Sequence, residues 1–83
     1  MAAYNTFQNF KDSIDNLEEL CNQVVSHKKI FMGMAGTFKS WLELYEPVYW
    51  KVDEKDIEEL TRQISLISEG VKQIIGLESS NVR

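Results

Sequence analysis

The sequence contains few of the residues that cross-link or interrupt small proteins, with one cysteine, one proline and four glycines among its 83 residues. Cys21 alone cannot form a disulfide within the chain, and we interpret it as a reduced thiol. No cluster of Cys and His residues offers a zinc site, and no cofactor is expected. A chain of this length buries only about 60% of its unfolded surface. Small domains compensate with disulfides, metals or self-association, so we expect a homo-oligomer.

Basic residues and long apolar runs are also scarce. Nine Lys and Arg residues against 13 Asp and Glu residues give a net charge of -4. This balance argues against sequence-independent binding of nucleic acid, which usually needs a basic stripe. No segment approaches the roughly 18 apolar residues of a membrane span, and the start, MAAYNTFQNFKD, lacks the pattern of a signal peptide. We therefore expect a cytoplasmic protein with no membrane partner.

Motifs of catalysis are missing as well. The chain has no P-loop, HExxH, GxSxG or EF-hand pattern. Cys21 and His27 are the only residues of their types, and their six-residue separation places them on different faces of a helix. That placement argues against a Cys/His nucleophile pair within one chain. We therefore expect that the protein is not an enzyme.

The strongest positive signal is a helical period of apolar residues. They recur three and four positions apart from the start of the chain, at Phe7, Phe10, Ile14, Leu17, Cys21 and Val24. The same count continues without a slip through Lys28, Phe31, Ala35, Phe38, Leu42 and Tyr45, of which only the lysine is polar. This spacing is typical of packed helices and predicts a long helix over residues 6–46. Pro47 then ends it, because proline disfavours helical geometry in the preceding residue.

Two glycines, Gly33 and Gly36, interrupt this first helix and leave two interpretations open. The unbroken spacing favours one continuous helix that bends at the glycines, which together cost about 2 kcal/mol relative to alanine. The alternative is a true break within residues 32–37.

A second helix is predicted over residues 54–75. Asp53 has the side chain of a good N-cap. Val52 and Ile57 can pack together across the helix start. The apolar positions follow at Ile57, Leu60, Ile64, Ile67, Val71 and Ile74. Gly76 is expected to end the helix, which leaves residues 78–83 as a flexible tail.

These two helices predict the architecture. At 1.5 Å per residue the first would be about 60 Å long and the second about 33 Å, so the second could cover only half of the first. Either the first helix folds back at Gly33–Gly36, or another copy covers its beginning. We therefore expect one all-α domain over residues 1–83, a helical hairpin or three-helix bundle that is oligomeric.

An aromatic cluster is the first candidate site. Trp41, Tyr45, Tyr49 and Trp50 place four aromatic rings within ten residues. Trp and Tyr are favoured at binding hot spots because they bury a large area and keep a polar group. We predict that these residues bind a protein partner. The alternative is that they close the open end of the bundle.

A small basic cluster is the second candidate. His27, Lys28 and Lys29, together with Tyr4, are candidates for binding an anion. Two functions follow from the two sites. The preferred one is a non-enzymatic helical protein that self-associates and acts by binding a protein partner. The alternative is an oligomer that sequesters an anionic, nucleotide-like small molecule in pockets between subunits, in the manner of a phage-type inhibitor or sponge.

Overall fold

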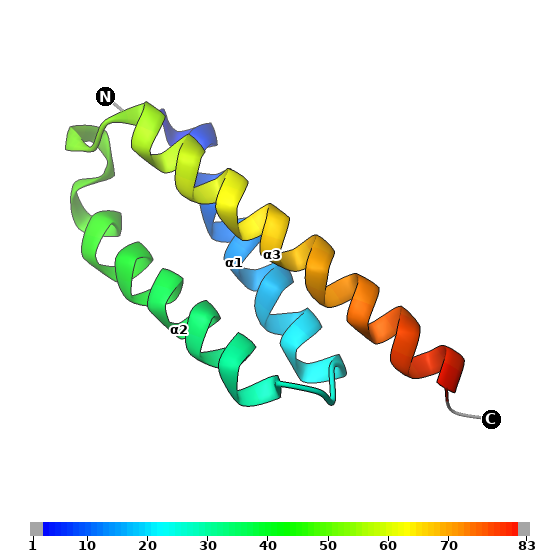
Figure 1. Ribbon diagram of the computed structural model, residues 1–83. Coiled ribbons are helices and arrows are strands. Elements are labelled where there is room, and N and C mark those ends of the chain that lie inside the picture. The colour runs from blue at the N-terminus through cyan, green and yellow to red at the C-terminus, as the bar shows by residue number, and fades with distance from the viewer. Residues whose placement is uncertain (1–2, 82–83) are drawn as a thin grey trace.

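The computed structural model describes residues 3–81 and confirms the predicted all-α class. The helices are α1 (Tyr4–Gln23), α2 (Lys28–Tyr45), the short 3-10 helix η1 (Glu46–Lys51) and α3 (Glu54–Asn81), as Figure 1 shows.

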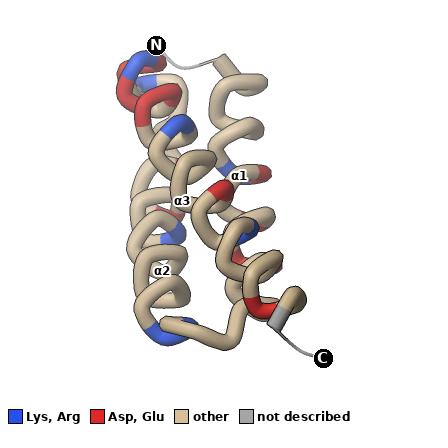
Figure 2. Tube along the Cα trace, turned by 45° about the vertical axis from the view of Figure 1, so that its right-hand side comes forward, with Lys and Arg blue, Asp and Glu red and all other residues tan. Residues whose placement is uncertain are grey.

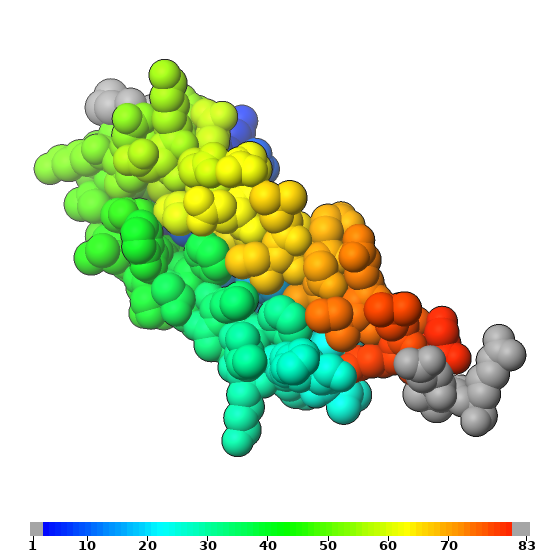
Figure 3. Space-filling model, viewed as in Figure 1, coloured from blue at the N-terminus to red at the C-terminus, as the bar shows by residue number. Residues whose placement is uncertain are grey.

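Helix α1 is the centre of an elongated bundle whose principal extents are 50 × 17 × 13 Å. It lies against both α2 and α3, whereas α2 and α3 make far fewer close backbone contacts with each other. In Figure 1, α1 runs behind the other two, and α2 runs antiparallel to both α1 and α3. In the space-filling view of the same side, α1 shows through only in places between α2 and α3 (Figure 3).

The predicted long first helix is in fact two helices, which the residues Val24–His27 separate. The continuous helix and the break at Gly33–Gly36 are therefore both wrong. A connection of four residues adds about as many positions as one helical turn of 3.6 residues. The spacing of apolar residues consequently continues across the connection, although the chain reverses direction there.

The turn between α1 and α2 forms without glycine or proline. Val24 leaves the helix in an extended conformation, with φ -76° and ψ 144°. His27 adopts the left-handed region, with φ 58° and ψ 25°, where histidine is enriched among residues other than glycine. The backbone N–H groups of Val25 and Ser26 donate to the Glu78 carboxylate over 3.0 and 2.6 Å. A side chain of α3 thus stabilises the turn, and the sequence around the turn does not indicate this contact.

The two glycines lie inside α2 in ordinary helical geometry, and neither has a positive φ. The hydroxyl groups of Thr37 and Ser40 donate to the carbonyl oxygens of Gly33 and Gly36, each over 3.0 Å. No atom of another element lies within 4 Å of the position that a Cβ would take at either glycine. Each glycine costs the helix about 1 kcal/mol relative to alanine, and close packing within the chain does not explain that cost.

The core forms mainly between α1 and α3. Six side chains are fully excluded from solvent, three on each helix: Phe10, Ile14, Leu17, Ile57, Ile64 and Val71. Burial of each contributes about 1.5–3 kcal/mol. The first half of α1 is therefore covered within a single chain. A second copy is therefore not needed to cover this half of α1.

The beginning of α3 was predicted correctly and its end was not. The Asp53 carboxylate accepts a hydrogen bond from the Lys55 N–H over 2.9 Å, as an N-cap does. Helix α3 passes through Gly76, which has no positive φ, and continues to Asn81. Within these last turns, the Glu78 carboxylate accepts hydrogen bonds from the α1–α2 turn and so joins the end of α3 to the rest of the bundle. Of the predicted tail, residues 78–81 are therefore helical, and residues 82 and 83 lie outside the described residues.

Candidate functional site

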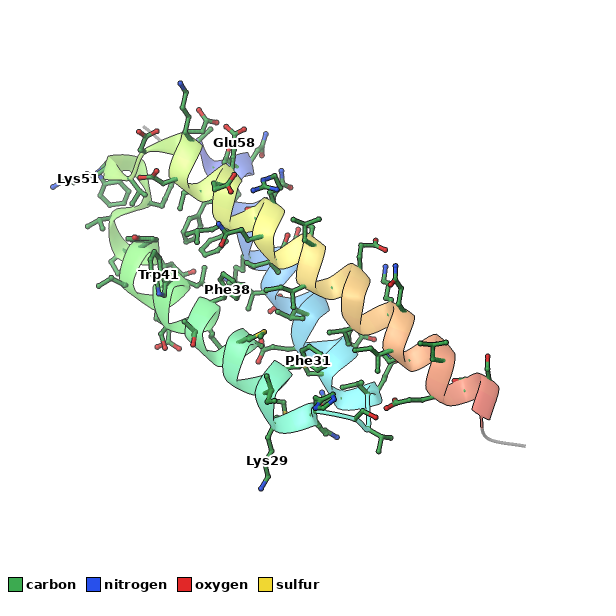
Figure 4. All side chains as sticks on the ribbon, in the orientation of Figure 1. Lys29, Phe31, Phe38, Trp41, Lys51 and Glu58 are labelled. Carbon is green, nitrogen blue, oxygen red and sulfur yellow. The ribbon has the colours of Figure 1, made fainter. Side chains whose placement is uncertain are left out.

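Helix α2 has a wide apolar arc, and the other helices of the chain cover only part of it. With 3.6 residues per turn, the arc from Ala35 to Leu44 spans about half of the helix circumference. Ala35 is buried in the core, next to α1. Phe31 and Phe38 are half-buried beside it, and Figure 4 shows both directed from α2 toward the side of the bundle that α1 and α3 occupy.

The remainder of the arc is exposed, and we call it the α2 strip: Ile30, Met34, Thr37, Trp41 and Leu44. Its four apolar side chains expose 58, 39, 43 and 69% of their surface, in chain order. Single exposed apolar residues are normal on protein surfaces, but contiguous apolar patches mark interaction sites. The strip repeats at intervals of four and three residues, the spacing with which one helix packs on another.

The predicted aromatic cluster divides into two pairs of rings. Trp41 and Tyr45 meet edge to face on α2, with their ring centroids 5.9 Å apart. Tyr49 and Trp50 meet in the same way on η1, with a separation of 5.3 Å. The four residues therefore form two adjoining surfaces and not a single one.

The second pair lies at the end of the bundle. Tyr49 packs on Phe7 and on Tyr4, with ring centroids 5.4 and 6.1 Å apart. It therefore closes the open end of the bundle, the alternative that the sequence also allowed. Trp50 and Val48 remain 47 and 38% exposed, and we call these two residues the end patch.

The predicted anion-binding residues lie at opposite ends of the molecule. Tyr4 begins α1, whereas His27, Lys28 and Lys29 follow its other end, which is about 30 Å away for a helix of 20 residues. The ammonium group of Lys28 donates to the carbonyl oxygen of Asn22 over 3.5 Å. One chain does not bring the four residues together, so a pocket that used all of them would need a second copy.

Two hollows in the surface do not suit an anion either. An open hollow of about 500 Å³ lies between α1 and α3 and contains two carboxylates but only one guanidinium group; it is lined by Thr6, Asn9, Glu54, Glu58, Thr61 and Arg62. A smaller one of about 70 Å³ lies between α1 and α2, lined by Glu18, Cys21, Asn22, Met32 and Ala35. His27, Lys28 and Lys29 line neither hollow.

The only thiol of the chain is poorly placed for chemistry. Cys21 is buried, and burial, followed by the negative charge of Glu18, raises its pKa, while Lys28 acts in the opposite direction. The thiolate, which is the reactive form, is therefore disfavoured. Among residues 3–81, no group of three His, Cys, Asp or Glu side chains is arranged to hold a metal ion.

The comparisons with known proteins leave the surface itself as the guide to function. No protein-family model matches the chain, and neither a curated protein nor a solved structure is significantly similar to it. Within the described part of the chain, no helix combines the length and the apolar content needed to cross a membrane.

Of the five residues of the α2 strip, sequence reasoning named only Trp41 as a site residue and did not name Ile30, Met34, Thr37 or Leu44. The signal was present, because Ile30, Met34, Trp41 and Leu44 form a second row of apolar residues with helical spacing beside the first.

Proposed function

We propose that this chain is a non-enzymatic interaction protein that associates with itself and acts by binding a protein partner. The observation that carries the proposal is the α2 strip, a row of exposed apolar side chains with the spacing of a helix-packing face. Burial of such side chains is the main source of free energy in most protein association. The largest of them, Trp41, belongs to the residue type most enriched at binding hot spots.

The non-enzymatic part of the proposal is supported by what the candidate residues do in the fold. Cys21 is buried, and the backbone of His27 shapes the α1–α2 turn. The two exposed tryptophans, Trp41 and Trp50, offer contact area and not acid–base chemistry.

Sedimentation velocity or native mass spectrometry tests self-association. The wild-type chain should form an oligomer at tens of micromolar, and Trp41→Ser should weaken it by more than about tenfold. Leu66→Ser is the matched control, because Leu66 is 58% exposed on α3 and lies away from the strip. A well-folded wild-type monomer at that concentration would remove self-association from the proposal.

Binding of another protein is proposed to use the end patch. Affinity purification from the source cells should identify a protein retained by the wild-type chain. With both proteins purified, Trp50→Ala should weaken that complex by roughly tenfold or more. Leu66→Ser again serves as the control. If Trp50→Ala and Trp41→Ser both bind the purified protein as tightly as the wild type does, the exposed aromatic residues are not the partner surface.

A further inference from the structure

Building on the self-association proposed above, we propose that the occupant of the α2 strip is the α2 helix of a second copy, packed antiparallel about a two-fold axis beside Thr37. In such a dimer each copy uses the same surface, so the strip must be complementary to itself. Its position along the helix, its shape and its charges each meet this requirement.

The position along the helix is the first argument. Thr37 lies at the middle of α2, which runs from Lys28 to Tyr45. An axis at this point lets two antiparallel copies of the helix overlap along their full length. Residues equally far from Thr37 then face each other, so Ile30 of one copy meets Leu44 of the partner subunit, seven positions away on either side. The two most exposed apolar side chains of the strip are thereby covered together.

The shape of the surface is the second argument. Trp41 lies four positions after Thr37 and Gly33 lies four positions before it. The axis therefore places the largest side chain of each copy opposite the partner's Gly33. At Gly33 no atom of another element comes within 4 Å of a Cβ position, which leaves room for an indole ring. Contacts within one chain do not explain the glycine at this position. In the dimer, the absence of a side chain there makes room for the partner's Trp41.

Charge is the third argument. Helix α2 begins with Lys28 and Lys29, has Glu43 in its last turn, and lacks acidic residues in its first turn and basic residues in its last. Figure 2 shows the lysines at the start of α2. The positive charges at the start of α2 and the negative charge near its end thus both interact unfavourably with the helix dipole. An antiparallel copy brings each basic end beside an acidic, carbonyl-rich end. Lys29 and Glu43 form no side-chain hydrogen bond or ion pair within residues 3–81, so no such contact within the described chain offsets these charges at the two ends of α2.

Cross-linking tests the position of the axis. A residue on a two-fold axis meets its own copy, so Thr37→Cys in a Cys21→Ala background should form a covalent dimer on mild oxidation, since a disulfide needs Cα atoms about 4.4–6.8 Å apart. Ser65→Cys in the same background is the matched control, because Ser65 is also exposed but lies on α3. It should remain monomeric on non-reducing gels under the same conditions.

Substitution of glycine tests the shape. Gly33→Leu should fill the space reserved for the partner's Trp41 and raise the dimer dissociation constant by more than about tenfold. Gly76→Leu is the matched control, since Gly76 is also helical, exposed and free of neighbours within 4 Å. Circular dichroism should show both variants folded.

The outcomes separate this inference from the proposal on which it rests. If the wild-type chain forms an oligomer but Thr37→Cys cross-links no better than Ser65→Cys, or Gly33→Leu leaves the dissociation constant unchanged, the antiparallel α2 dimer is overturned and self-association stands. If the wild-type chain is monomeric at tens of micromolar, both are overturned.

Discussion

At the residue scale, Glu78 has an effect out of proportion to its position near the end of the chain. Its carboxylate holds the turn between α1 and α2 through the N–H groups of Val25 and Ser26. Hydrogen bonds from Ser26 and Val25, and the nearby His27, lower its pKa from the ordinary value of 4.5. One acidic side chain therefore connects the last turns of α3 to the point where the chain first reverses.

This arrangement predicts a pH dependence of stability. A carboxylate whose pKa is lowered in the folded state stabilises it above the unfolded pKa, and the contribution disappears as pH falls through the folded pKa. Glu78→Gln should therefore lower the melting temperature at neutral pH, and the difference from wild type should vanish in acid, well below pH 4.5. Thermal melts at a series of pH values measure this. A difference that persists unchanged in acid would contradict it, and Glu69→Gln, on the exposed side of α3, is the control.

Gly36 offers a second test at this scale. Because no atom of another element lies within 4 Å of its Cβ position, Gly36→Ala should raise the free energy of unfolding of the single chain by about 1 kcal/mol through helix propensity. Chemical denaturation at low protein concentration measures the change. A loss of stability would mean that another part of the chain approaches Gly36 closely, contrary to the structure. Gly76→Ala, also in an open helical position, should give a similar gain.

At the element scale, the reversal at Val24–His27 decides the fold. A continuous helix would place spin labels at Ser13 and Ser40 about 40 Å apart, at 1.5 Å per residue. In the folded chain α2 returns along α1, and Lys39 forms an ion pair with Glu18 over 3.4 Å. Pulsed electron resonance on the doubly labelled chain should therefore give a distance far below 40 Å. A single peak near 40 Å would restore the continuous helix.

The sequence predicted which segments are helical better than it predicted where they end. Spacing alone identified the core positions of α1 and α3, and capping chemistry identified Asp53. Spacing failed at Val24–His27 because a four-residue turn preserves the count. The only local signs of the break were the polar Lys28 and the two valines before it, Val24 and Val25, whose branched side chains disfavour helix. Gly76 was a poor signal of a helix end because a glycine ends a helix only when the chain turns there, and here α3 continues to Asn81 and places Glu78 against the α1–α2 turn.

The candidate site was only partly predictable for a related reason. Tyr49 and Trp50 are neighbours in sequence, yet one closes the bundle and the other remains exposed. Which of two aromatic residues turns inward depends on Phe7 and Tyr4, far away in the chain. Conversely, Tyr4 could not be separated from His27 until the direction of α1 and its end were known.

At the scale of the whole molecule, the proposed association predicts a link between stability and concentration. A dimer that is more stable than its monomer has a melting temperature that rises with protein concentration. Wild-type chain should therefore melt several degrees higher at a hundredfold greater concentration. Trp41→Ser should show little dependence, whereas Leu66→Ser should behave like wild type. Differential scanning fluorimetry over a dilution series is sufficient, and a flat wild-type curve would count against association.

Three helices run along the length of the bundle in alternating directions, so the start of α1 and the end of α3 lie at opposite ends of a 50 Å body (Figure 1). A tag at one end of a copy is therefore remote from a tag at the other end of the same copy. In the antiparallel α2 dimer inferred above, the end of α3 of one subunit lies at the same end of the dimer as the start of α1 of the partner subunit. Two copies could then be encoded in tandem as one polypeptide, joined by a linker much shorter than the molecule.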